Sequence, residues 1–508
     1  MYIKVRHGGS QTAMLLKEIL DSIDVEKVAR FRDLEIKDLC YDSRLVQPGQ
    51  AFFCIKGLVT DGHLFVGDAA SSGAEVLFVE RDPDEEIPPD VVVVTVRDTR
   101  LALAHCSAKF YGEPSEHLKL VGVTGTNGKT TTTFLIENIF KKAGQFTGLI
   151  GTVENHIGDV VEQVTRTTPE SLDLQRLLRR MVDVGIEVVA MEVSSHALEL
   201  HRANGCKFDV VMFTNLTQDH LDFHISLEEY FGAKKRLFEG EEFGSERSAL
   251  INIDDEFGRK LIEETTLPAR SFGLDPSADI RAQDIDISSS GNRFTLSWNN
   301  EEMPISTILQ GRFNAYNCLA AAGAAIELGA DRESIVDGLE RLTGVPGRFE
   351  RIDCGQPFTA LVDYAHTPDG IRNVLEACRE VTGGRVIIVV GCGGDRDRSK
   401  RALMGRVAVE LSELCVITSD NPRSEDPRAI IEMIIEGVRD TLPPERYTVV
   451  VERREAIKKA LSEARPGDLV VVAGKGHESG QIFADRVIPF DDRQVVRECL
   501  REVTGAQC

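Results

Sequence analysis

The chain has 508 residues, of which 42% are hydrophobic and 28% charged, and a formal net charge of -23 at pH 7. The length predicts roughly three domains, and the acidic balance argues against nucleic acid or an anionic membrane as a partner. An anionic ligand would therefore need local basic pockets.

The N-terminal twenty residues lack the apolar core of a secretion signal, and no apolar run approaches the length of a membrane span. The eleven cysteines are scattered and include no C-x-x-C pair. This usage indicates reduced thiols rather than a disulfide framework or a zinc site. We therefore expect a cytoplasmic protein.

Glycine- and proline-rich breaks at 112–115 and 344–347 predict three domains with the bounds 1–113, 114–346 and 347–508. Valine- and isoleucine-rich runs alternate with helical segments, which predicts the α/β class, with parallel sheets covered on both faces. Ligand sites in such sheets lie beyond the carboxyl ends of the strands. In chain order, strands are predicted over 50–53, 76–79, 118–123, 187–192, 210–213, 361–364, 386–390, 414–418 and 469–473, and helices over 132–142, 171–184, 227–238, 369–380, 400–411 and 427–440.

The segment 125–130, with the sequence GTNGKT, lies between a predicted strand and a predicted helix. Strand, glycine loop and helix form the context in which a P-loop holds nucleotide phosphates. The helix N-terminus adds partial positive charge, Lys129 can reach the β- and γ-phosphates, and Thr130 can hold Mg2+. Val123 stands where the strict pattern has glycine, so the loop is a variant. The alternative, a glycine turn with an exposed lysine, is disfavoured by the threonines that follow.

Two residues near predicted strand ends, Glu192 and His220, and one helix residue, Lys234, are considered for metal binding. Glu192 ends a buried strand run close to the P-loop, which suits a Mg2+ ligand; the alternative is an acid that caps the next turn. His220 follows the strand over 210–213, but a lone histidine is more often structural. Lys234 lies between apolar residues of a helix, as surface lysines with apolar stems do. Spacing alone therefore assigns no function to His220 or Lys234.

Four strand ends in the last segment are unusually polar, at 363–368, 391–396, 418–423 and 474–478. Each alone could be a surface turn, but four at equivalent strand ends predict one ligand crevice. The glycine-rich end at 391–396 is not G-x-G-x-x-G, so a dinucleotide site is not predicted. The arginines and Glu478 in these segments suit a zwitterionic ligand that carries carboxylates and amines.

Together these motifs resemble one family over essentially the whole chain, the Mur ligases, which are ATP-dependent amide-bond ligases of bacterial cell-wall synthesis. The resemblance implies a smaller N-terminal α/β domain, a central P-loop ATPase domain with a mostly parallel sheet, and a Rossmann-like C-terminal domain. The segments that carry it are Asp42–Arg44, Gly125–Thr130, Thr167–Pro169, Glu192–His196, Asn215–His220 with Asp222, Gly311–Asn314 with Asn317, Gly347–Arg348, Asp363–His366, Asp420–Arg423 and Gly474–Glu478.

The resemblance also implies roles for single residues. For ATP they are Gly125, Thr126, Asn127, Gly128, Lys129, Thr130, Thr131, Asn317, Arg348 and Asp363. For the nucleotide-sugar dipeptide they are Ser43, Thr167, Thr168, Ser194 and Arg202, and for the incoming amino acid Arg396, Asp420, Asn421, Pro422, Arg423, Gly474 and Glu478. For Mg2+ they are Thr130, Glu192, His220 and Lys234, with Lys234 as a carbamate (N6-carboxylysine); Lys129, Lys234, Glu192 and His220 are the implied catalytic residues.

The substrates implied are UDP-N-acetylmuramoyl-L-alanyl-D-glutamate, meso-diaminopimelate and ATP, with Mg2+ as cofactor. ATP would phosphorylate the D-glutamate γ-carboxylate, and the amine of diaminopimelate would attack the acyl phosphate. This step belongs to peptidoglycan precursor synthesis in the cytoplasm. We expect a monomer that has no membrane span and binds no nucleic acid.

Three alternatives are weighed. An L-lysine-adding version of the same ligase would differ mainly at the segment Asp420–Arg423. A folylpolyglutamate synthase-like ligase would not explain that segment or the polar first domain. A regulatory P-loop GTPase would need an Asn-Lys-x-Asp motif, which the sequence lacks, and would not need the C-terminal crevice.

Overall fold

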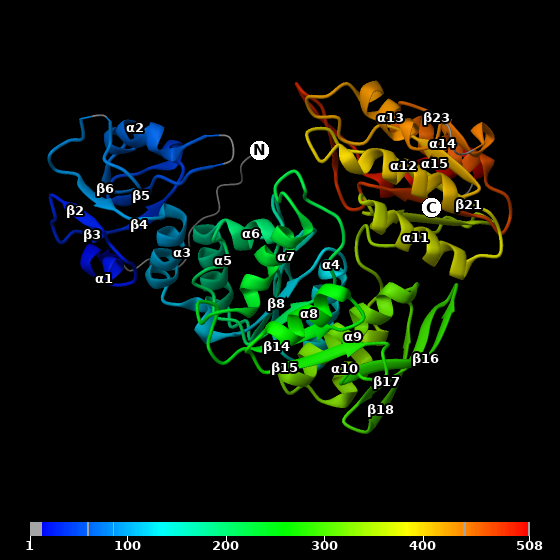
Figure 1. The fold of residues 1–508 in the computed structure, drawn as a ribbon, viewed down its shortest axis with the longest axis horizontal. Helices are drawn as coiled ribbons and strands as arrows, with labels where there is room; N and C mark the ends of the chain where they lie inside the picture. The colour runs from blue at the N-terminus through cyan, green and yellow to red at the C-terminus, as the bar shows by residue number, and fades with distance from the viewer. Residues whose placement is uncertain (1–12, 58–59, 85, 440–442, 506–508) are drawn as a thin grey trace. The chain divides into compact units, whose positions relative to one another are not determined.

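The computed structural model describes residues 13–57, 60–84, 86–439 and 443–505, and it is an α/β protein (Figure 1). Its residues cluster into two compact units, which are described separately below. The first comprises Met1–Gly122, Gln145–Val211 and Arg236–Arg247; the second comprises Val123–Gly144, Met212–Lys235 and Ser248–Cys508.

A five-stranded sheet in the first unit has the order β2-β7-β6-β5-β4, and its pairs are parallel except β2 with β7. Phe53 and Phe78 stack on one face with ring centroids 4.1 Å apart, and apolar residues of α1 and α3 cover that face. Residues of α2 cover the other face. The bounds are β2 Lys27–Ala29, β4 Asp38–Cys40, β5 Gln50–Phe53, β6 Ala74–Val79, β7 Val92–Thr95, α1 Leu16–Leu20, α2 Val66–Ser71 and α3 Thr99–Phe110, with the short pair β1 Met14–Leu15 and β3 Glu35–Ile36 and the 3-10 helices η1 Ser43–Leu45 and η2 Gly62–Phe65.

The middle of the chain contributes strands to both units. The first unit holds β11-β10-β9-β12, in which β9 and β12 are parallel and the other pairs antiparallel. The first-unit elements are β9 Thr147–Ile150, β10 Glu154–Ile157, β11 Val160–Gln163, β12 Val188–Glu192, α5 Ser171–Asp183, α6 Ser195–Glu199, η3 Pro114–His117 and η4 Arg236–Phe238.

The second unit holds β14-β15-β16-β17-β18, with parallel pairs from β14 to β16 and an antiparallel meander beyond. Strands β8 Lys119–Thr124 and β13 Val210–Phe213 have residues in each unit. The remaining second-unit elements of this segment are β14 Ser248–Asn252, β15 Ala269–Gly273, β16 Ile280–Ser288, β17 Gly291–Trp298, β18 Glu301–Thr307, α4 Lys129–Lys142, α7 Leu227–Lys235, α8 Glu256–Glu264, α9 Arg312–Glu327 and α10 Arg332–Glu340.

A six-stranded sheet, β19-β20-β24-β21-β22-β23, forms the C-terminal part of the second unit and is parallel except for β19 with β20. Helices α11, α12 and α13 cover one face, and α14 and α15 the other (Figure 1). The bounds are β19 Glu350–Ile352, β20 Thr359–Asp363, β21 Val386–Val390, β22 Leu414–Ile417, β23 Tyr447–Val449, β24 Leu469–Ala473, α11 Pro368–Val381, α12 Ser399–Leu411, α13 Pro427–Glu436, α14 Arg453–Glu463 and α15 Asp492–Thr504, with η5 Pro444–Arg446 and the hairpin β25 Gly480–Ile482 and β26 Val487–Pro489.

Strand β21 shows why the sequence forms this sheet. Its five residues are all fully buried; Val386, Ile388 and Val390 pack on one face and Ile387 and Val389 on the other. Successive strand residues point to opposite faces, so a continuous Val/Ile run fits a strand covered on both sides. Each such side chain contributes about 1.5–3 kcal/mol on burial.

The structure confirms the predicted α/β class and most predicted elements, with small shifts at the ends. The helix expected from residue 132 begins at Lys129, and the helix expected over 227–238 ends at Lys235 and continues as η4. The helix expected over 427–440 ends at Glu436, and its last expected residue lies outside the described ones. The three-domain division stays a prediction.

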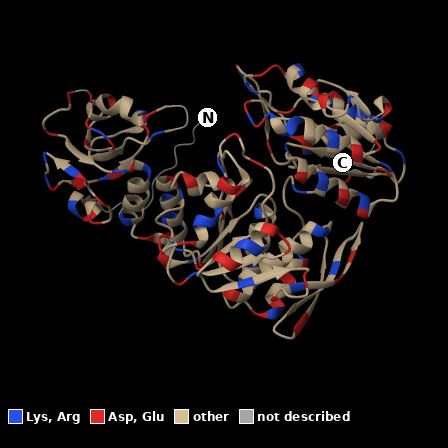
Figure 2. Ribbon diagram, in the orientation of Figure 1, with Lys and Arg blue, Asp and Glu red and all other residues tan. Residues whose placement is uncertain are grey.

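Among the described residues, no helix has the length and apolar character needed to cross a membrane. Within the part of the chain that the structure describes, nine cysteines are free and buried. Cys354 is disulfide-bonded, so the expectation of reduced thiols is wrong at that position. Figure 2 shows basic and acidic residues interspersed along the helices rather than gathered on one basic region.

Helices α4 and α10 pack so closely that Gly338 leaves no room for a side chain. A Cβ at Gly338 would collide with the backbone of Ile139. We predict that Gly338→Ala lowers the free energy of unfolding by about 1–3 kcal/mol, because the two helices must separate. Gly232→Ala is the matched control, since Gly232 is helical with open space around it, and it should be neutral or stabilising. Thermal unfolding of both variants checks this; equal melting temperatures would contradict it.

Candidate functional site

The glycine loop lies at the carboxyl end of β8 and leads into α4. Gly125 and Gly128 have φ angles of +144° and +89°, which L side chains rarely adopt. A Cβ at Gly128 would lie 2.5 Å from Asn317 Oδ1. Gly128 is the N-cap residue of α4 and has no side-chain cap, so the helix leaves backbone N–H donors for an anion. This geometry is that of a phosphate-binding loop.

Two lysines donate to the same carbonyl of this loop. Lys129 Nζ and Lys234 Nζ each lie 2.8 Å from Gly125 O, and Lys129 also donates to Thr126 O at 2.9 Å. Lys234 is 1% exposed and lies 4.4 Å from the centre of the Tyr230 ring. Burial, together with the charge of Lys129, lowers the pKa of Lys234 well below its ordinary value, against the opposing effect of Asp219. The Lys234 ammonium group therefore loses its proton more readily than that of an exposed lysine.

Arg348 connects the loop to the sheet of the C-terminal segment. Its Nη2 donates to Thr130 Oγ1 at 3.0 Å, and its guanidinium lies 4.4 Å from the centre of the Tyr364 ring. Asp363, at the end of β20, accepts from the N–H groups of Phe349 and Ala365, each at 2.7 Å. Burial raises the pKa of Asp363, although Arg348 opposes the shift. Of the residues expected at ATP, Arg348 and Thr130 are thus in direct contact.

Asn317 and Asn127 are held by short side-chain hydrogen bonds. Asn317 Nδ2 donates to Asn314 Oδ1 at 2.9 Å, within the first turns of α9. Asn127 Nδ2 donates to Asp369 Oδ2 at 3.0 Å, and its backbone N–H donates to Asn215 Oδ1 at 2.9 Å. Thr131 is buried in α4.

Asp219, a buried carboxylate that the sequence did not single out, lies beside one lysine and two histidines. His220 Nε2 is 3.4 Å from Asp219, Lys400 Nζ 3.5 Å and His366 Nε2 3.8 Å. Burial raises the pKa of Asp219, but these neighbours outweigh it and hold the pKa far below its usual range. His220 itself has a left-handed backbone with φ +55°. Asp219 therefore fixes the surroundings of the histidine expected at the metal.

In the first unit, a chain of hydrogen bonds joins Glu192 to three expected ligand residues. Thr152 donates to both oxygens of Glu192, through its N–H at 2.8 Å and its hydroxyl at 2.9 Å. Thr168 Oγ1 donates to the Glu192 carbonyl at 2.9 Å and accepts from the Ser194 N–H at 3.2 Å. Thr152 Oγ1 also accepts from the Thr167 hydroxyl at 3.1 Å. The network fixes Glu192 at the end of β12.

Arg202 lies beside the buried carboxylate of Glu170, with Nε at 3.4 Å, and Arg100 and Arg166 approach the same carboxylate at 3.2 and 3.6 Å. Three arginines around one carboxylate leave positive charge for an anionic ligand. Ser43 begins η1 after Asp42. Among the described residues, no hydrogen bond or ion pair joins Ser43 to Arg202 or Ser194.

The four polar strand ends of the C-terminal sheet do lie side by side, because β20, β24, β21 and β22 are adjacent parallel strands. Asn421 Nδ2 donates to Glu478 Oε2 at 2.7 Å. Lys475 Nζ, fully buried, donates to Asn421 Oδ1 at 2.8 Å and to Glu478 Oε2 at 2.9 Å. A Cβ at Gly474 would lie 2.6 Å from Asp420 Oδ2. Segments far apart in sequence thus form one polar cluster.

Arg423 extends this cluster toward the loop after β21. Its Nη1 donates to Gly394 O at 2.7 Å. Burial and the nearby charge of Arg396 lower the pKa of Arg423. Arg396 is exposed and donates to Asp395 O at 3.0 Å, while Pro422 is buried. Burial raises the pKa of Asp420, but Lys475 and Arg453 outweigh it, so this pKa lies below its ordinary value.

Beneath the cluster, Arg453 and Asp492 form a fully buried ion pair with contacts of 2.8 and 2.5 Å. Arg453 also donates to Ala473 O at 2.9 Å, next to Gly474. The sequence did not identify Arg453, Asp492 or Lys475 as functional, and no local pattern marks the pairing.

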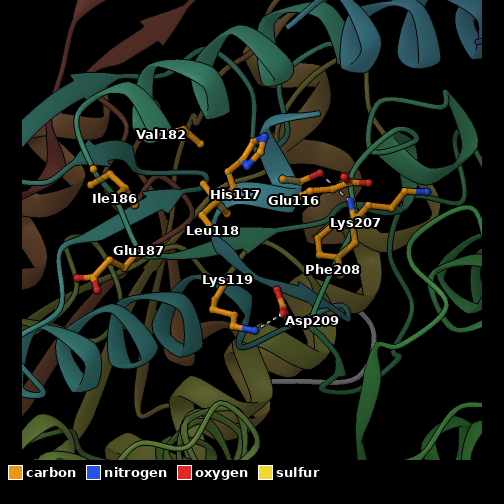
Figure 3. Close-up of a pocket in the computed structure, with 12 residues that line it drawn as sticks. Glu116, His117, Leu118, Lys119, Val182, Ile186, Glu187, Lys207, Phe208 and Asp209 are labelled. Atoms are coloured by element: carbon orange, nitrogen blue, oxygen red, sulfur yellow. Dashed lines mark hydrogen bonds and ion pairs between the residues drawn. The ribbon is translucent and has the colours of Figure 1, made fainter. Parts of the chain in front are cut away.

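The first unit contains a cavity of about 610 Å3 (Figure 3). It is formed at the amino ends of β8, β12 and β13, where Lys119 pairs with Asp209 at 3.0 Å. Ligands of parallel sheets bind at the opposite, carboxyl ends, and no residue expected at a site lines it. Among the described residues, no group of three or more His, Cys, Asp or Glu side chains is arranged to hold a metal ion.

Comparisons with known proteins agree with this geometry. Three sequence models match: "Mur ligase family, catalytic domain" over residues 35–111, "Mur ligase middle domain" over 123–325, and "Mur ligase, glutamate ligase domain" over 347–476. The chain is 46% identical to a UDP-N-acetylmuramoyl-L-alanyl-D-glutamate--2,6-diaminopimelate ligase of Syntrophomonas wolfei, covering 96% of this chain and 99% of that one. It is 43% identical to the protein of that name from Clostridium botulinum, covering 96% and 100%.

A solved structure of that name is 32% identical, with a TM-score of 0.67 over 96% of this chain and 99% of the other. A folylpolyglutamate synthase of Mycobacterium tuberculosis is similar in fold alone, at 16% identity and a TM-score of 0.62 over 74% of this chain and 93% of that one.

The geometry of the glycine loop yields a test. We predict that Gly128→Ala weakens nucleotide binding on the order of tenfold or more, because its Cβ meets Asn317 and its φ is positive. Gly144→Ala is the matched control: its φ is also positive, at +77°, but nothing lies within 4 Å of its Cβ. Calorimetric titration with ADP checks both variants. Equal affinities would contradict the assigned loop.

Proposed function

The chain belongs to the Mur ligase family, and we propose that it joins meso-diaminopimelate to UDP-N-acetylmuramoyl-L-alanyl-D-glutamate, converting ATP to ADP and phosphate. Relatives 42–46% identical over nearly their whole length bear the name of that ligase. The observation that carries the proposal is the cluster of Asn421, Arg423 and Glu478 at the ends of β22 and β24, the two strands that flank β21. It brings a cation and an anion together at one edge of the sheet.

We propose a role for each predicted domain. Residues 1–113 would hold the UDP-sugar, 114–346 would bind ATP, and 347–508 would bind the incoming amino acid. The reaction would supply peptidoglycan precursor in the cytoplasm, and the enzyme would act as a monomer.

ATP is the co-substrate of this family, and the glycine loop is its proposed site. Backbone N–H groups at the start of α4 would bind the phosphates. Lys129, which now donates to loop carbonyls, would turn to the γ-phosphate and stabilise the charge that spreads over its oxygens. Asn317, Arg348 and Asp363 would complete the nucleotide site, and Arg348 already contacts Thr130.

The residues fit Mg2+ only if Lys234 is carbamylated. Thr130, Glu192 and His220 supply hard oxygen and imidazole donors, whereas a bare lysine supplies none. A buried amine with a lowered pKa loses its proton more readily, and its neutral form can attack CO2, giving a carbamate and a proton. Bound there, Mg2+ would neutralise charge on the phosphate oxygens. The Lys234 carbamate would be one of the groups that hold it.

The chemistry then follows from the carboxylate, which is a poor acyl donor until it is phosphorylated. The D-glutamate γ-carboxylate would attack the γ-phosphate, ADP would leave, and an acyl phosphate would form. Thr167, Thr168, Ser194 and Arg202 would position the dipeptide in this step, with Ser43 at the nucleotide-sugar. The free amine of diaminopimelate would attack the acyl carbon, phosphate would leave, and the amide would remain.

Amino-acid choice is proposed to depend on the C-terminal cluster. Arg423 offers a planar fork for the distal carboxylate of diaminopimelate, and Glu478 pairs with the neighbouring ammonium. Asn421, Asp420, Gly474, Pro422 and Arg396 shape the same site. L-lysine lacks the distal carboxylate, so it would leave Arg423 unpaired in a closed site, which disfavours its binding.

Phosphate release tests the proposed function. With ATP and UDP-N-acetylmuramoyl-L-alanyl-D-glutamate, the enzyme should release phosphate rapidly only when meso-diaminopimelate is added. Rapid release with L-lysine alone would assign the lysine-adding activity, and no release with either amino acid would refute the proposal.

We predict that Lys234→Ala loses activity by at least about 100-fold, because the carbamate is gone. Added acetate or formate should restore part of the activity, since a small carboxylate can take the place of the missing oxygens. Lys235→Ala, next to it but paired with Glu264 at 2.8 Å, should remain active. Steady-state phosphate release measures all three. Full activity of Lys234→Ala without an added carboxylate would refute the carbamate.

We predict that Arg423→Ala abolishes the preference for meso-diaminopimelate over L-lysine. Hydrogen bonds to charged groups contribute about 1.5–3 kcal/mol each, so two of them separate the amino acids by roughly 10²- to 10⁴-fold. The loss should appear mainly as a raised KM for diaminopimelate. Comparing kcat/KM for both amino acids decides the matter; an undiminished preference would show that Arg423 only shapes the turn.

A further inference from the structure

The turn that carries Asn421 and Arg423 is attached to the hairpin β25–β26, which follows the last of the four polar strand ends. Gln481 Nε2 donates to Asp420 O at 2.7 Å. The Ile482 N–H donates to Asn421 Oδ1 at 3.0 Å, and Ile482 O accepts from the Arg423 N–H at 3.0 Å. The hairpin thus holds the turn at three successive points, before, at and after Asn421.

These attachments matter because the turn is strained. Arg423 has φ +53°, a left-handed conformation that costs a non-glycine residue energy and persists only where its surroundings impose it. Pro422 has no N–H, so the turn has few backbone donors with which to fix itself. The bridge between Arg423 and Phe483 and the bond from Gln481 supply that constraint.

Gln481 is a buried polar side chain without an assigned role. It is 4% exposed, and its amide reaches Asp420 O and, more weakly, Ser419 Oγ at 3.5 Å. Its strand pairs with β26 through Gln481↔Ile488 and Ile482↔Val487. The Gln481 side chain therefore couples the position of the turn Asp420–Arg423 to that of the hairpin.

We propose that Gln481 is a positioning residue for amino-acid selectivity, acting through the turn Asp420–Arg423. Its amide and the neighbouring Ile482 backbone hold the Asn421 amide and the Arg423 guanidinium where the distal carboxylate of the amino acid would bind. This inference rests on the proposed function. Small displacements of such recognition groups cost much affinity, so losing the amide affects the amino acid more than the other substrates.

The test compares Gln481→Met with Gln494→Met. Both replace an amide by an apolar chain of similar length, but Gln494 is exposed on α15 and bonds Glu498 at 2.9 Å. In Gln481→Met we expect the KM for meso-diaminopimelate to rise about tenfold and its advantage over L-lysine to shrink in proportion. The KM for ATP and for the nucleotide-sugar dipeptide should stay within about twofold. Gln494→Met should match the unmodified enzyme.

A merely structural Gln481 would lower the melting temperature and leave the selectivity unchanged, and that result would overturn the inference. So would a Gln481→Met effect that persists in full in the Arg423→Ala background, because residues that act through one another are not additive. Gln481→Asn, which keeps an amide one methylene short, gives the same readout if Gln481→Met does not fold. If the unmodified enzyme releases no phosphate with meso-diaminopimelate, the proposed function fails, and the inference fails with it.

Discussion

Two lysine side chains that donate to one carbonyl, that of Gly125, determine the chemistry of the central site. Lys129 and Lys234 both lie 2.8 Å from this oxygen, and Lys234 is buried. Two ammonium groups at one buried acceptor repel each other in a medium of low dielectric constant. The buried lysine yields its proton more readily, and this difference underlies the roles proposed for Lys129 at the phosphate and for Lys234 with CO2. The positive φ of Gly125 presents the carbonyl that both share.

Elsewhere, buried ions form a scaffold under a few accessible recognition groups. In the C-terminal segment, Arg453 with Asp492 and Lys475 with Asn421 are buried, while Glu478 and Arg423 are only partly buried. Breaking a buried pair leaves an uncompensated charge and is costly, so the scaffold has essentially one arrangement. The buried pairs therefore hold Glu478 and Arg423, the side chains proposed to recognise the amino acid, in defined positions. The same principle appears in the first unit, where Thr152 and Thr168 hold Glu192.

The sequence predicted what short-range patterns can encode. The Val/Ile runs located β21 and β24 with the observed bounds, because a strand buried on both faces needs an uninterrupted apolar run. The glycine spacing and a lysine at the start of a predicted helix indicated that Gly125–Thr130 is a phosphate-binding loop. The four polar strand ends predicted one cluster, because parallel strands end at the same edge of a sheet.

The features that the sequence could not predict depend on contacts between residues that are far apart in the chain. Gln481 bonds a residue 61 positions away, and Arg453 pairs with a residue 39 positions away, so neither has a local signal. Lys234 is spaced like an ordinary helix lysine, and only the family resemblance assigned it a role; its burial is a product of packing. Asp219 precedes a histidine that drew attention, yet its other neighbours, His366 and Lys400, come from two distant parts of the chain.

The central claim is that the buried Lys234 amine is uncharged and takes up CO2. Incubating the enzyme with 13C-labelled bicarbonate and recording its 13C NMR spectrum tests this directly. The account predicts a carbamate resonance in the unmodified enzyme and in Lys235→Ala, and none in Lys234→Ala. An active enzyme with no carbamate resonance, or the same resonance in Lys234→Ala, would contradict it.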